Sequence, residues 1–354
     1  MPRALDRAFW RGRRVLLTGH TGFKGSWLAL CLKRLGAHVE GLALAPDTDP
    51  SLYHLAGVAA EVPGGLADLR DIAAVARVVA AAAPQIVFHL AAQPLVRRSV
   101  REPLATFATN VMGTVHLLDA LRASDRLEAV LVVTSDKVYQ GGLGRPLREN
   151  DPLGAHDPYS SSKAAAEIVA SAYAQTYFAE RSIPVAAARS GNVIGGGDFS
   201  EDRLVPDIYR AMIAGRSLVL RNPDATRPWH HVLDCVCGYL AYVEALAQRR
   251  NVPLALNFAP SNDAQVPVAH LAAAMQAALG VTTRTLLGSA VAGAPEEVQE
   301  LTLDAELAHK ALGWSDRFDA RAAIKATADW YLALVRGDDM GAFTRRSLED
   351  HLVS

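Results

Sequence analysis

The stretch Arg14-Val15-Leu16-Leu17-Thr18, followed by Gly19-His20-Thr21-Gly22-Phe23-Lys24-Gly25, decides the fold of this 354-residue chain. The apolar run predicts a buried strand, and residues 26–35, ended by Gly36, predict a helix. The three glycines permit a tight turn, close approach of a pyrophosphate to the backbone, and close packing of the helix on the strand. The N–H groups and the dipole of a helix N-terminus also favour an anion. The unit therefore predicts a dinucleotide-binding site.

Apolar strands and helical runs alternate through the first half of the chain. Such βα repeats predict a doubly wound parallel sheet of the Rossmann type, an α/β fold with right-handed crossovers. After Gly191 the sequence becomes rich in glycine and proline and its predicted strands are short, which predicts a smaller C-terminal substrate-binding lobe. We expect residues 1–190 to form the dinucleotide-binding domain, about 228–260 to return to it, and 191–354 to form mainly the lobe. The expected elements are strands at 38–44, 86–90, 129–134 and 185–189 and helices at 71–83, 103–122 and 160–181.

Composition excludes several classes of protein. Half the residues are hydrophobic and the formal net charge is −1, so a large core is possible and no basic surface for nucleic acid or membrane is expected. No apolar run has the length of a signal peptide or a membrane span, and we expect a cytoplasmic protein. The cysteines, Cys31, Cys235 and Cys237, are too few for a disulfide framework. Cys235 and Cys237 fall on a predicted helix and face apart, so no metal site is expected.

The cofactor's ribose-binding residue does not follow the usual pattern. An acid normally ends the second strand and binds the ribose hydroxyls of NAD, whereas an Arg there accepts the phosphate of NADP. Here the position falls near Ala43, the first carboxylate is Asp47, and no Arg is present. The choice between NAD and NADP stays open, with NAD favoured. Asp68, with Leu69, either binds the adenine edge or caps the next helix.

Two pairs of side chains indicate catalysis. Tyr159 and Lys163 are four residues apart and share one face of a predicted helix. A nearby ammonium and a nicotinamide charge would lower the pKa of the tyrosine towards neutrality. Ser135, Asp136 and Lys137 follow a strand, where parallel sheets present residues to a ligand. Asp136 beside Lys137 is either an acid–base pair or a solvated ion pair.

At these motifs the chain resembles the extended short-chain dehydrogenase/reductases, and within them the nucleotide-sugar 4,6-dehydratases, most of all the group acting on CDP-glucose. Lys137 and the Gly-His-Thr-Gly-Phe-Lys-Gly turn are the specific features, because the dTDP-glucose and GDP-mannose groups have a glutamate at the position of Lys137. The resemblance covers nearly the whole chain. It runs through Phe9-Trp10, the turn at 19–25, residues 89–96 and 109–114, Thr134-Ser135-Asp136-Lys137, Asp157-Pro158-Tyr159-Ser160, residues 191–198, Arg227-Pro228-Trp229 and Leu312-Gly313-Trp314.

The resemblance implies an NAD-dependent lyase. Tyr159 would take a proton from the sugar C4 hydroxyl while NAD accepts the C4 hydride. Lys137 would then remove the C5 proton, Asp136 would protonate the departing C6 hydroxyl, and the hydride would return to C6. Ser135 would bind the substrate hydroxyl and Tyr159. The implied cofactor-binding residues are Gly19, Thr21, Gly22, Phe23, Lys24, Gly25, Asp68, Leu69, Leu90, Ala91, Ala92, Gln93, Tyr159 and Lys163.

Three residues are expected to hold the substrate. Arg227 suits a pyrophosphate, since a guanidinium binds two oxygens at once, Arg203 could assist it, and Asn192 could bind a phosphate or sugar oxygen. The alternatives are a dehydratase of another nucleotide sugar, an epimerase or oxidoreductase that leaves Asp136 and Lys137 idle, and a non-catalytic dinucleotide-binding protein. The resemblance further implies a homodimer, packed through 103–122 and 160–181.

Overall fold

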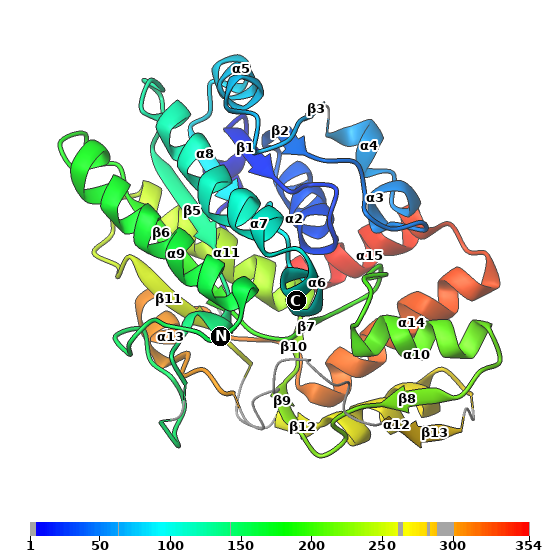
Figure 1. Ribbon diagram of the computed structural model, residues 1–354. Coiled ribbons are helices and arrows are strands. Elements are labelled where there is room, and N and C mark those ends of the chain that lie inside the picture. The colour runs from blue at the N-terminus through cyan, green and yellow to red at the C-terminus, as the bar shows by residue number, and fades with distance from the viewer. Residues whose placement is uncertain are drawn as a thin grey trace.

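The computed structural model describes residues 5–62, 64–141, 143–260, 265–281, 284–288 and 301–353. A seven-stranded parallel sheet lies at its centre, in the order β11-β6-β5-β4-β1-β2-β3 (Figure 1). The order reverses between β1 and β4, and ligands bind outside the carboxyl ends of strands at such a point. The strands are β1 (Arg14–Thr18), β2 (His38–Ala43), β3 (Gly64–Leu66), β4 (Ile86–His89), β5 (Ala129–Val133), β6 (Val185–Ser190) and β11 (Ala255–Phe258).

Helices cover both faces of the sheet, which confirms the predicted α/β fold (Figure 1). β4 and β5 are buried along their whole length, as continuous apolar strands between two helical layers must be. One face carries α2 (Phe23–Arg34) and α11 (Val232–Ala247). The other carries α5 (Ile72–Ala82), α8 (Gly113–Leu121) and α9 (Pro158–Tyr173).

Two of the predicted helices contain a π-helical turn. The predicted helix 103–122 is split into α7 (Pro103–Phe107), the turn η1 (Ala108–Met112) and α8. The helix expected at 160–181 begins earlier as α9 and ends in the turn η3 (Ala174–Phe178). The first helix likewise begins at Phe23 rather than at residue 26, because Gly22 is its N-cap. The remaining short elements of this half are α1 (Arg7–Trp10), α3 (Leu52–Leu55), α4 (Val58–Glu61), α6 (Val96–Arg101) and the 3₁₀ turn η2 (Asp136–Val138).

A smaller group of elements lies beyond the carboxyl ends of the strands, at the lower right of Figure 1. Within it α12 packs against α10 and α14. Residues 232–258 lie with the sheet, because α11 packs against α2 and β11 pairs with β6. The group comprises α10 (Leu204–Ile213), α12 (Val268–Ala278), α14 (Ala320–Arg336), β8 (Leu218–Leu220), β9 (Thr226–Pro228), β12 (Gln265–Pro267) and β13 (Thr285–Leu287). Further elements are β7 (Val193–Ile194), β10 (His230–His231) and α13 (Glu306–Leu312).

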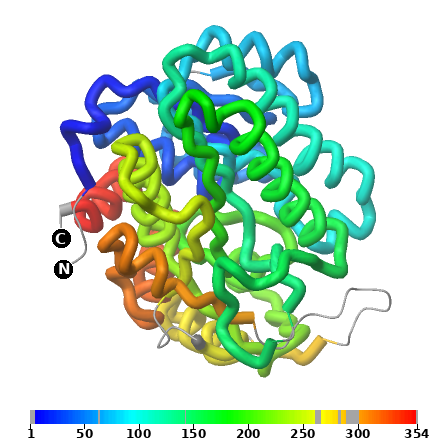
Figure 2. Tube along the Cα trace, turned by 90° about the vertical axis from the view of Figure 1, so that its left-hand side faces the viewer, coloured from blue at the N-terminus to red at the C-terminus, as the bar shows by residue number. Residues whose placement is uncertain are grey.

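The C-terminal helix α15 (Met340–Val353) packs against the first βα unit, so opposite ends of the chain lie together (Figure 2). Arg34 of α2 pairs with Glu349 at 2.8 Å, and Arg345 pairs with Glu61 of α4. No sequence pattern beyond Gly337 predicts this helix. Within the described ranges no helix is long and apolar enough to cross a bilayer.

Candidate active site

The glycine-rich turn between β1 and α2 leaves space that side chains would fill. Gly19 has a φ of +78°, and a Cβ there would lie 2.7 Å from the amide nitrogen of Ala91. A Cβ on Gly25 would lie 1.9 Å from the carbonyl oxygen of Gly19. Gly22 is the N-cap of α2 and offers no side chain to bind the first helical N–H groups. These N–H groups are therefore available to a pyrophosphate, and the turn fits a dinucleotide.

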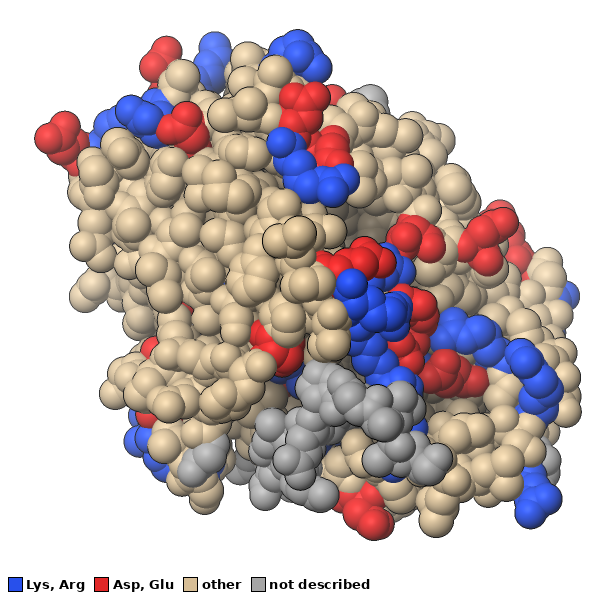
Figure 3. All heavy atoms as spheres, viewed as in Figure 1, with Lys and Arg blue, Asp and Glu red and all other residues tan. Residues whose placement is uncertain are grey.

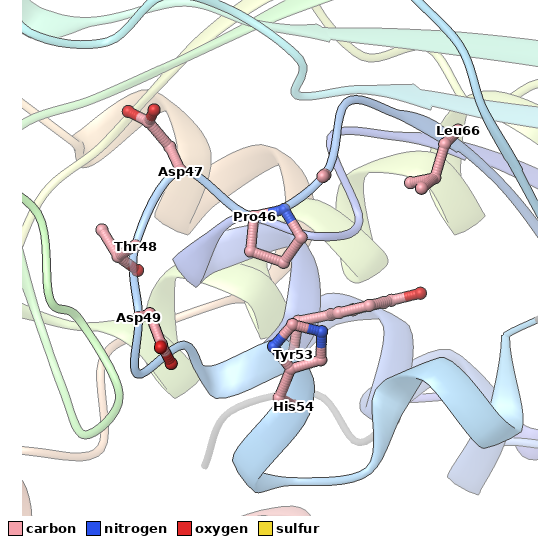
Figure 4. Close-up of a pocket in the computed structure, with 8 residues that line it drawn as sticks. Pro46, Asp47, Thr48, Asp49, Tyr53, His54 and Leu66 are labelled. Atoms are coloured by element: carbon pink, nitrogen blue, oxygen red, sulfur yellow. The ribbon is translucent and has the colours of Figure 1, made fainter.

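A cavity of about 480 Å³ lies beyond the carboxyl end of β2. The loop that bounds it carries Asp47 and Asp49, with Tyr53 and His54 of α3 on one side and Leu66 of β3 opposite (Figure 4). Tyr53 also packs on His20 of the glycine-rich turn, with ring centroids 5.7 Å apart. The place where the ribose-binding acid was sought is thus occupied by a loop with two carboxylates.

Asp68 and Leu69 follow β3, the neighbouring strand. The Asp68 carboxylate accepts hydrogen bonds from the Arg70 side chain at 2.6–3.1 Å, and these lower the pKa of Asp68. The helix cap is Asp71, which accepts from the Ala74 amide, so Asp68 is not the capping residue of α5. Asp68 as an adenine ligand stays a prediction.

The loop after β4 is tied to α9 by a side chain in the π-helical turn η1. Asn110 accepts from the Gln93 amide at 2.7 Å and donates to the Gln93 carbonyl at 3.1 Å and to Ser162 Oγ at 2.8 Å. At the strand end His89 lies between Thr18 and Thr114, at 2.8 and 3.0 Å. Burial, followed by the charge of Lys163, lowers the pKa of His89 to about 3. His89 is therefore a neutral packing residue, and Asn110 fixes residues 90–93 beside the catalytic helix.

Tyr159 and Lys163 lie in the first two turns of α9 and are both buried. The Lys163 ammonium donates to the Val133 carbonyl at 2.7 Å, at the end of β5. Burial, followed by the charge of Lys24, lowers the pKa of Lys163 to about 7. Two lysines, one from the glycine-rich turn and one from α9, therefore act on each other in one poorly solvated place.

The pKa of Tyr159 differs from the expected direction. Burial raises it, and the Ser135 hydroxyl and the charge of Arg203 lower it less strongly. Among the cations of the described chain, Arg203 is the one whose charge lowers the pKa of Tyr159. Ser135 therefore lies within reach of the Tyr159 hydroxyl, and the charge of Arg203 acts on it from the segment before α10.

Asp136 is almost fully buried, and its two carboxyl oxygens differ. Oδ1 accepts from Ser135 Oγ at 2.9 Å, while Oδ2 has no hydrogen-bond partner among the described residues. Gly191 packs against Oδ2, where a Cβ would come within 2.9 Å. In the described part of the chain Asp136 and Lys137 form no ion pair, so the solvated-pair alternative is not observed. Lys137 is half-buried and donates its backbone N–H to Ser135 Oγ at 3.2 Å.

A buried ion pair holds α9 against the ends of β5 and β6. Arg189 Nε lies 3.0 and 3.1 Å from the two carboxylate oxygens of Glu167, which also accepts from Thr134 at 3.1 Å. Arg189 Nη1 donates to the Tyr139 hydroxyl at 2.7 Å. Thr134 directly precedes Ser135, and Glu167 lies one turn after Lys163. The pair thus fixes the strand end that carries Asp136 relative to the helix that carries Tyr159.

The expected substrate residues lie at different depths. Arg203 precedes α10, and its Nη2 is 3.5 Å from the Pro94 carbonyl. Asn192 follows β6 and its carbonyl accepts from the His230 amide at 3.0 Å. Arg227 is buried in β9, where its Nη1 donates to the Thr226 carbonyl at 2.9 Å. Of these three, Arg203 has a recorded interaction with Tyr159.

Sequence reasoning missed Asn110, Ser99, Glu167 and Arg189. Ser99 Oγ accepts from the Tyr159 amide at 3.0 Å and so holds the start of α9. The available signal was polarity within apolar runs: Asn110 in a long helix, and Arg189 at the end of a buried strand.

Comparison with known proteins gives consistent results. The model of the "NAD dependent epimerase/dehydratase family" matches residues 15–255. The chain is 39% identical to CDP-glucose 4,6-dehydratase of Salmonella typhimurium, over 98% of both chains. It is 28% identical to dTDP-glucose 4,6-dehydratase 1 of Escherichia coli, over 75% of this chain and 78% of that one. A UDP-glucose-4-epimerase from Stenotrophomonas maltophila, solved with NAD and a formylated UDP-arabinopyranose, has the same fold: TM-score 0.79, 24% identity, 92% of this chain and 99% of that one.

The glycines at 22 and 25 should respond differently to alanine. Gly25→Ala places a methyl group against the Gly19 carbonyl and should destabilise the protein by about 1–3 kcal/mol. At Gly22 the added Cβ meets only ordinary contact at 3.5 Å, so Gly22→Ala should keep wild-type stability. It should nevertheless weaken dinucleotide binding about tenfold, because the methyl group stands before the helix N–H groups. Urea unfolding and calorimetric titration with NAD measure the two effects, and equal behaviour of the variants would contradict the assignment.

The lowered pKa of Lys163 predicts a pH-dependent stability. Because the pKa is about 7 in the folded protein and ~10.4 in the unfolded chain, the unfolded state binds more protons between these values. The unfolding free energy of the wild type should therefore rise relative to Lys163→Met, by up to about 1.4 kcal/mol per pH unit. Urea unfolding of both proteins from about pH 6.5 to 9 measures the slope. A constant difference would show that Lys163 keeps an ordinary pKa.

Proposed function

The chain belongs to the NAD dependent epimerase/dehydratase family, and from this membership together with the site we propose that it dehydrates CDP-glucose to CDP-4-dehydro-6-deoxyglucose. NAD is the cofactor, and when bound it accepts a hydride from the sugar and later returns it. The residues that would hold NAD are the glycine-rich turn, the loop 90–93, Tyr159 and Lys163. Asp49 beyond β2 would repel the additional phosphate of NADP, whereas the charge of Asp47 is compensated by Arg98.

Tyr159 acts as the base at the sugar C4 hydroxyl. Its pKa must fall for this role, and three groups near it favour the phenolate. The Ser135 hydroxyl and the Arg203 charge lower the pKa of Tyr159 directly. Lys163 lies one turn after Tyr159 on α9 and donates to the Val133 carbonyl of β5. When it is protonated, it adds positive charge to the same site.

Asp136 carries the argument for dehydration rather than epimerisation. Buried polar atoms in proteins are almost always hydrogen-bonded, and an exception at a cleft suggests a group reserved for a ligand. The free Oδ2 of Asp136 is such an atom, one residue from Ser135. Asp136, when protonated, donates to the departing C6 hydroxyl. Lys137, when neutral, removes the C5 proton that the C4 ketone has made acidic. An enzyme that only oxidised or inverted C4 would need neither group.

Arg203 is the residue best placed to bind the substrate diphosphate. It precedes α10 and reaches the Pro94 carbonyl in the loop after β4, so its guanidinium can bind two phosphate oxygens while the sugar reaches Ser135 and Asp136. Arg227 and Asn192, further along the lobe and the β6 end, are proposed as additional ligands of the same group. These contacts do not select the base, so the choice of CDP-glucose derives from relatedness.

Substrate and reaction can be tested together. The purified protein is incubated separately with CDP-glucose, dTDP-glucose, GDP-mannose and UDP-glucose, with and without added NAD, and products are analysed by mass spectrometry. We expect loss of one water from CDP-glucose only. In the same assay Lys137→Ala and Asp136→Asn should lower dehydration about 10²- to 10⁴-fold, the usual contribution of a general acid or base.

The variants also separate the steps. Lys137→Ala should still reduce NAD, seen at 340 nm, while Tyr159→Phe should lose both NAD reduction and dehydration. Lys310→Ala, a lysine paired with Glu306 on an exposed helix face, is the matched control and should behave as wild type. Full dehydration by Lys137→Ala would remove it as the base. Water loss from another sugar nucleotide would keep the chemistry and correct the substrate. Accumulation of reduced NAD without water loss from any of them would indicate an oxidoreductase.

We further propose a homodimer formed through α7, η1 and α9. Four apolar side chains there are exposed in the single chain: Leu104 at 86%, Ile168 at 60%, Met112 at 46% and Phe107 at 39%. Burial of this face would remove them from water. Leu104→Glu should therefore convert a dimer to a monomer in sedimentation velocity, and a monomeric wild type would refute the proposal.

A further inference from the structure

Helix α6 and the segment before α10 are joined by ion pairs. Arg98 donates from Nε and Nη2 to Glu201 Oε1 at 3.2 and 3.1 Å, and Arg101 Nη2 reaches the same oxygen at 3.2 Å. Arg97 lies 3.6 Å from Asp202. α6 follows the loop after β4, whereas Glu201 and Asp202 belong to residues 199–203 that lead into the smaller lobe. The contacts thus join parts of the chain about a hundred residues apart.

The network extends on both sides. Arg98 Nη1 also donates to Asp47 Oδ2 at 2.6 Å, on the loop after β2, and Arg221 Nη1 donates to Asp202 at 2.8 Å, directly after β8. In Figure 3 basic and acidic side chains gather in alternation between α6 and α10, where the two halves of the molecule meet. Two neighbouring sets of ion pairs therefore meet at Glu201 and Asp202: one reaches the loop after β2 through Arg98, and the other reaches the end of β8 through Arg221.

The held segment ends at Arg203. Asp202 has a φ of +56°, so the backbone turns sharply immediately before Arg203. Arg210 of α10 binds the carbonyls of Phe199 and Ser200 at 3.0 and 3.1 Å, which fixes the other side of the segment. Arg203 is thereby directed over the loop after β4, where its Nη2 lies 3.5 Å from the Pro94 carbonyl. Its charge also lowers the pKa of Tyr159, less strongly than burial raises it.

We propose that Arg98, Arg101 and Glu201, together with the Arg97–Asp202 pair, are positioning residues that hold residues 199–203 against α6 and so keep Arg203 at the Pro94 end of the loop after β4, where it receives the substrate diphosphate. The role rests on the proposed function, because the anion it serves is the nucleotide sugar. The network itself does not touch the reacting atoms. Its loss should therefore weaken substrate binding and leave the chemical step intact.

The size of the effect follows from the exposure of the pairs. Arg97, Arg98 and Asp202 are about a quarter exposed and Glu201 is 46% exposed, so each pair is partly screened by solvent and salt. Sharing matters more than any single pair: Glu201 serves two arginines and Arg98 serves two carboxylates. Removing Glu201 or Arg98 should thus release the segment to a similar extent, and removing both should add little.

The test compares Glu201→Gln, Arg98→Met and the double variant with wild type in CDP-glucose dehydration. Each single variant should raise KM for CDP-glucose about two- to fivefold with kcat unchanged, and the double variant should resemble the worse single variant. Raising NaCl should increase the wild-type KM and affect the variants less. The matched control is Arg122→Met, which breaks an exposed pair with Asp119 remote from the cleft and should keep the wild-type KM.

A second measurement does not depend on turnover. Amide hydrogen exchange in residues 199–203 should be faster in Glu201→Gln and Arg98→Met than in wild type, and unchanged in Arg122→Met. Unchanged exchange in the first two variants would overturn the proposal. Faster exchange with an unaltered KM would do the same, as would strictly additive effects of the two substitutions on KM in the double variant. Should the wild type fail to dehydrate CDP-glucose, the proposed function is wrong. The holding of residues 199–203 by the ion pairs is then tested by hydrogen exchange alone. Faster exchange in Glu201→Gln and Arg98→Met supports it, and unchanged exchange refutes it.

Discussion

The buried pair of Arg189 and Glu167 is the interaction on which the geometry of the site depends. A charge taken into the interior is tolerated only with a close partner and satisfied hydrogen bonds, and both conditions are met where β5, β6 and α9 converge. The pair leaves little freedom for α9 to slide or rotate. Since Thr134 is bound to the same carboxylate, the strand end that bears Ser135 and Asp136 is fixed against the helix that bears Tyr159 and Lys163.

Within this frame the site gathers groups of differing charge in one poorly solvated space. Burial, followed by repulsion from Lys24, lowers the pKa of Lys163. Burial raises the pKa of Tyr159, and Ser135 and then Arg203 offset part of that rise. Asp136 has one oxygen held by Ser135 and the other free. In the described part of the chain these acidic and basic side chains therefore do not form ion pairs with one another and can act on different atoms of a substrate. This arrangement suits a reaction that moves protons at neighbouring carbon and oxygen atoms of one substrate.

Local sequence patterns predicted most of the fold and part of the candidate site. Glycine spacing after an apolar strand identified the turn at 19–25, and the interval between Tyr159 and Lys163 placed them on one helical face. Contacts between distant residues had no such signal, as for Arg98 with Glu201. The role of Asn110 was also hidden, because it depends on a π-helical turn within a run that reads as an ordinary helix. The absence of an ion pair between Asp136 and Lys137 could not be predicted either, because the Asp136 carboxylate is packed between Ser135 and Gly191, which the sequence pattern does not reveal.

The packing of α15 against α2 has a consequence for the synthesis of the chain. β1 and α2 are synthesised well before residues 340–353, whose Glu349 pairs with Arg34 of α2, and the sheet gains its last strand only at 255–258. An early fragment therefore carries the complete glycine-rich turn on a helix whose apolar side, including Trp27, is still in contact with water. Domains with many contacts between residues distant in sequence fold slowly and expose apolar surface in their intermediates. We therefore expect chaperones that act during translation to bind the first βα unit.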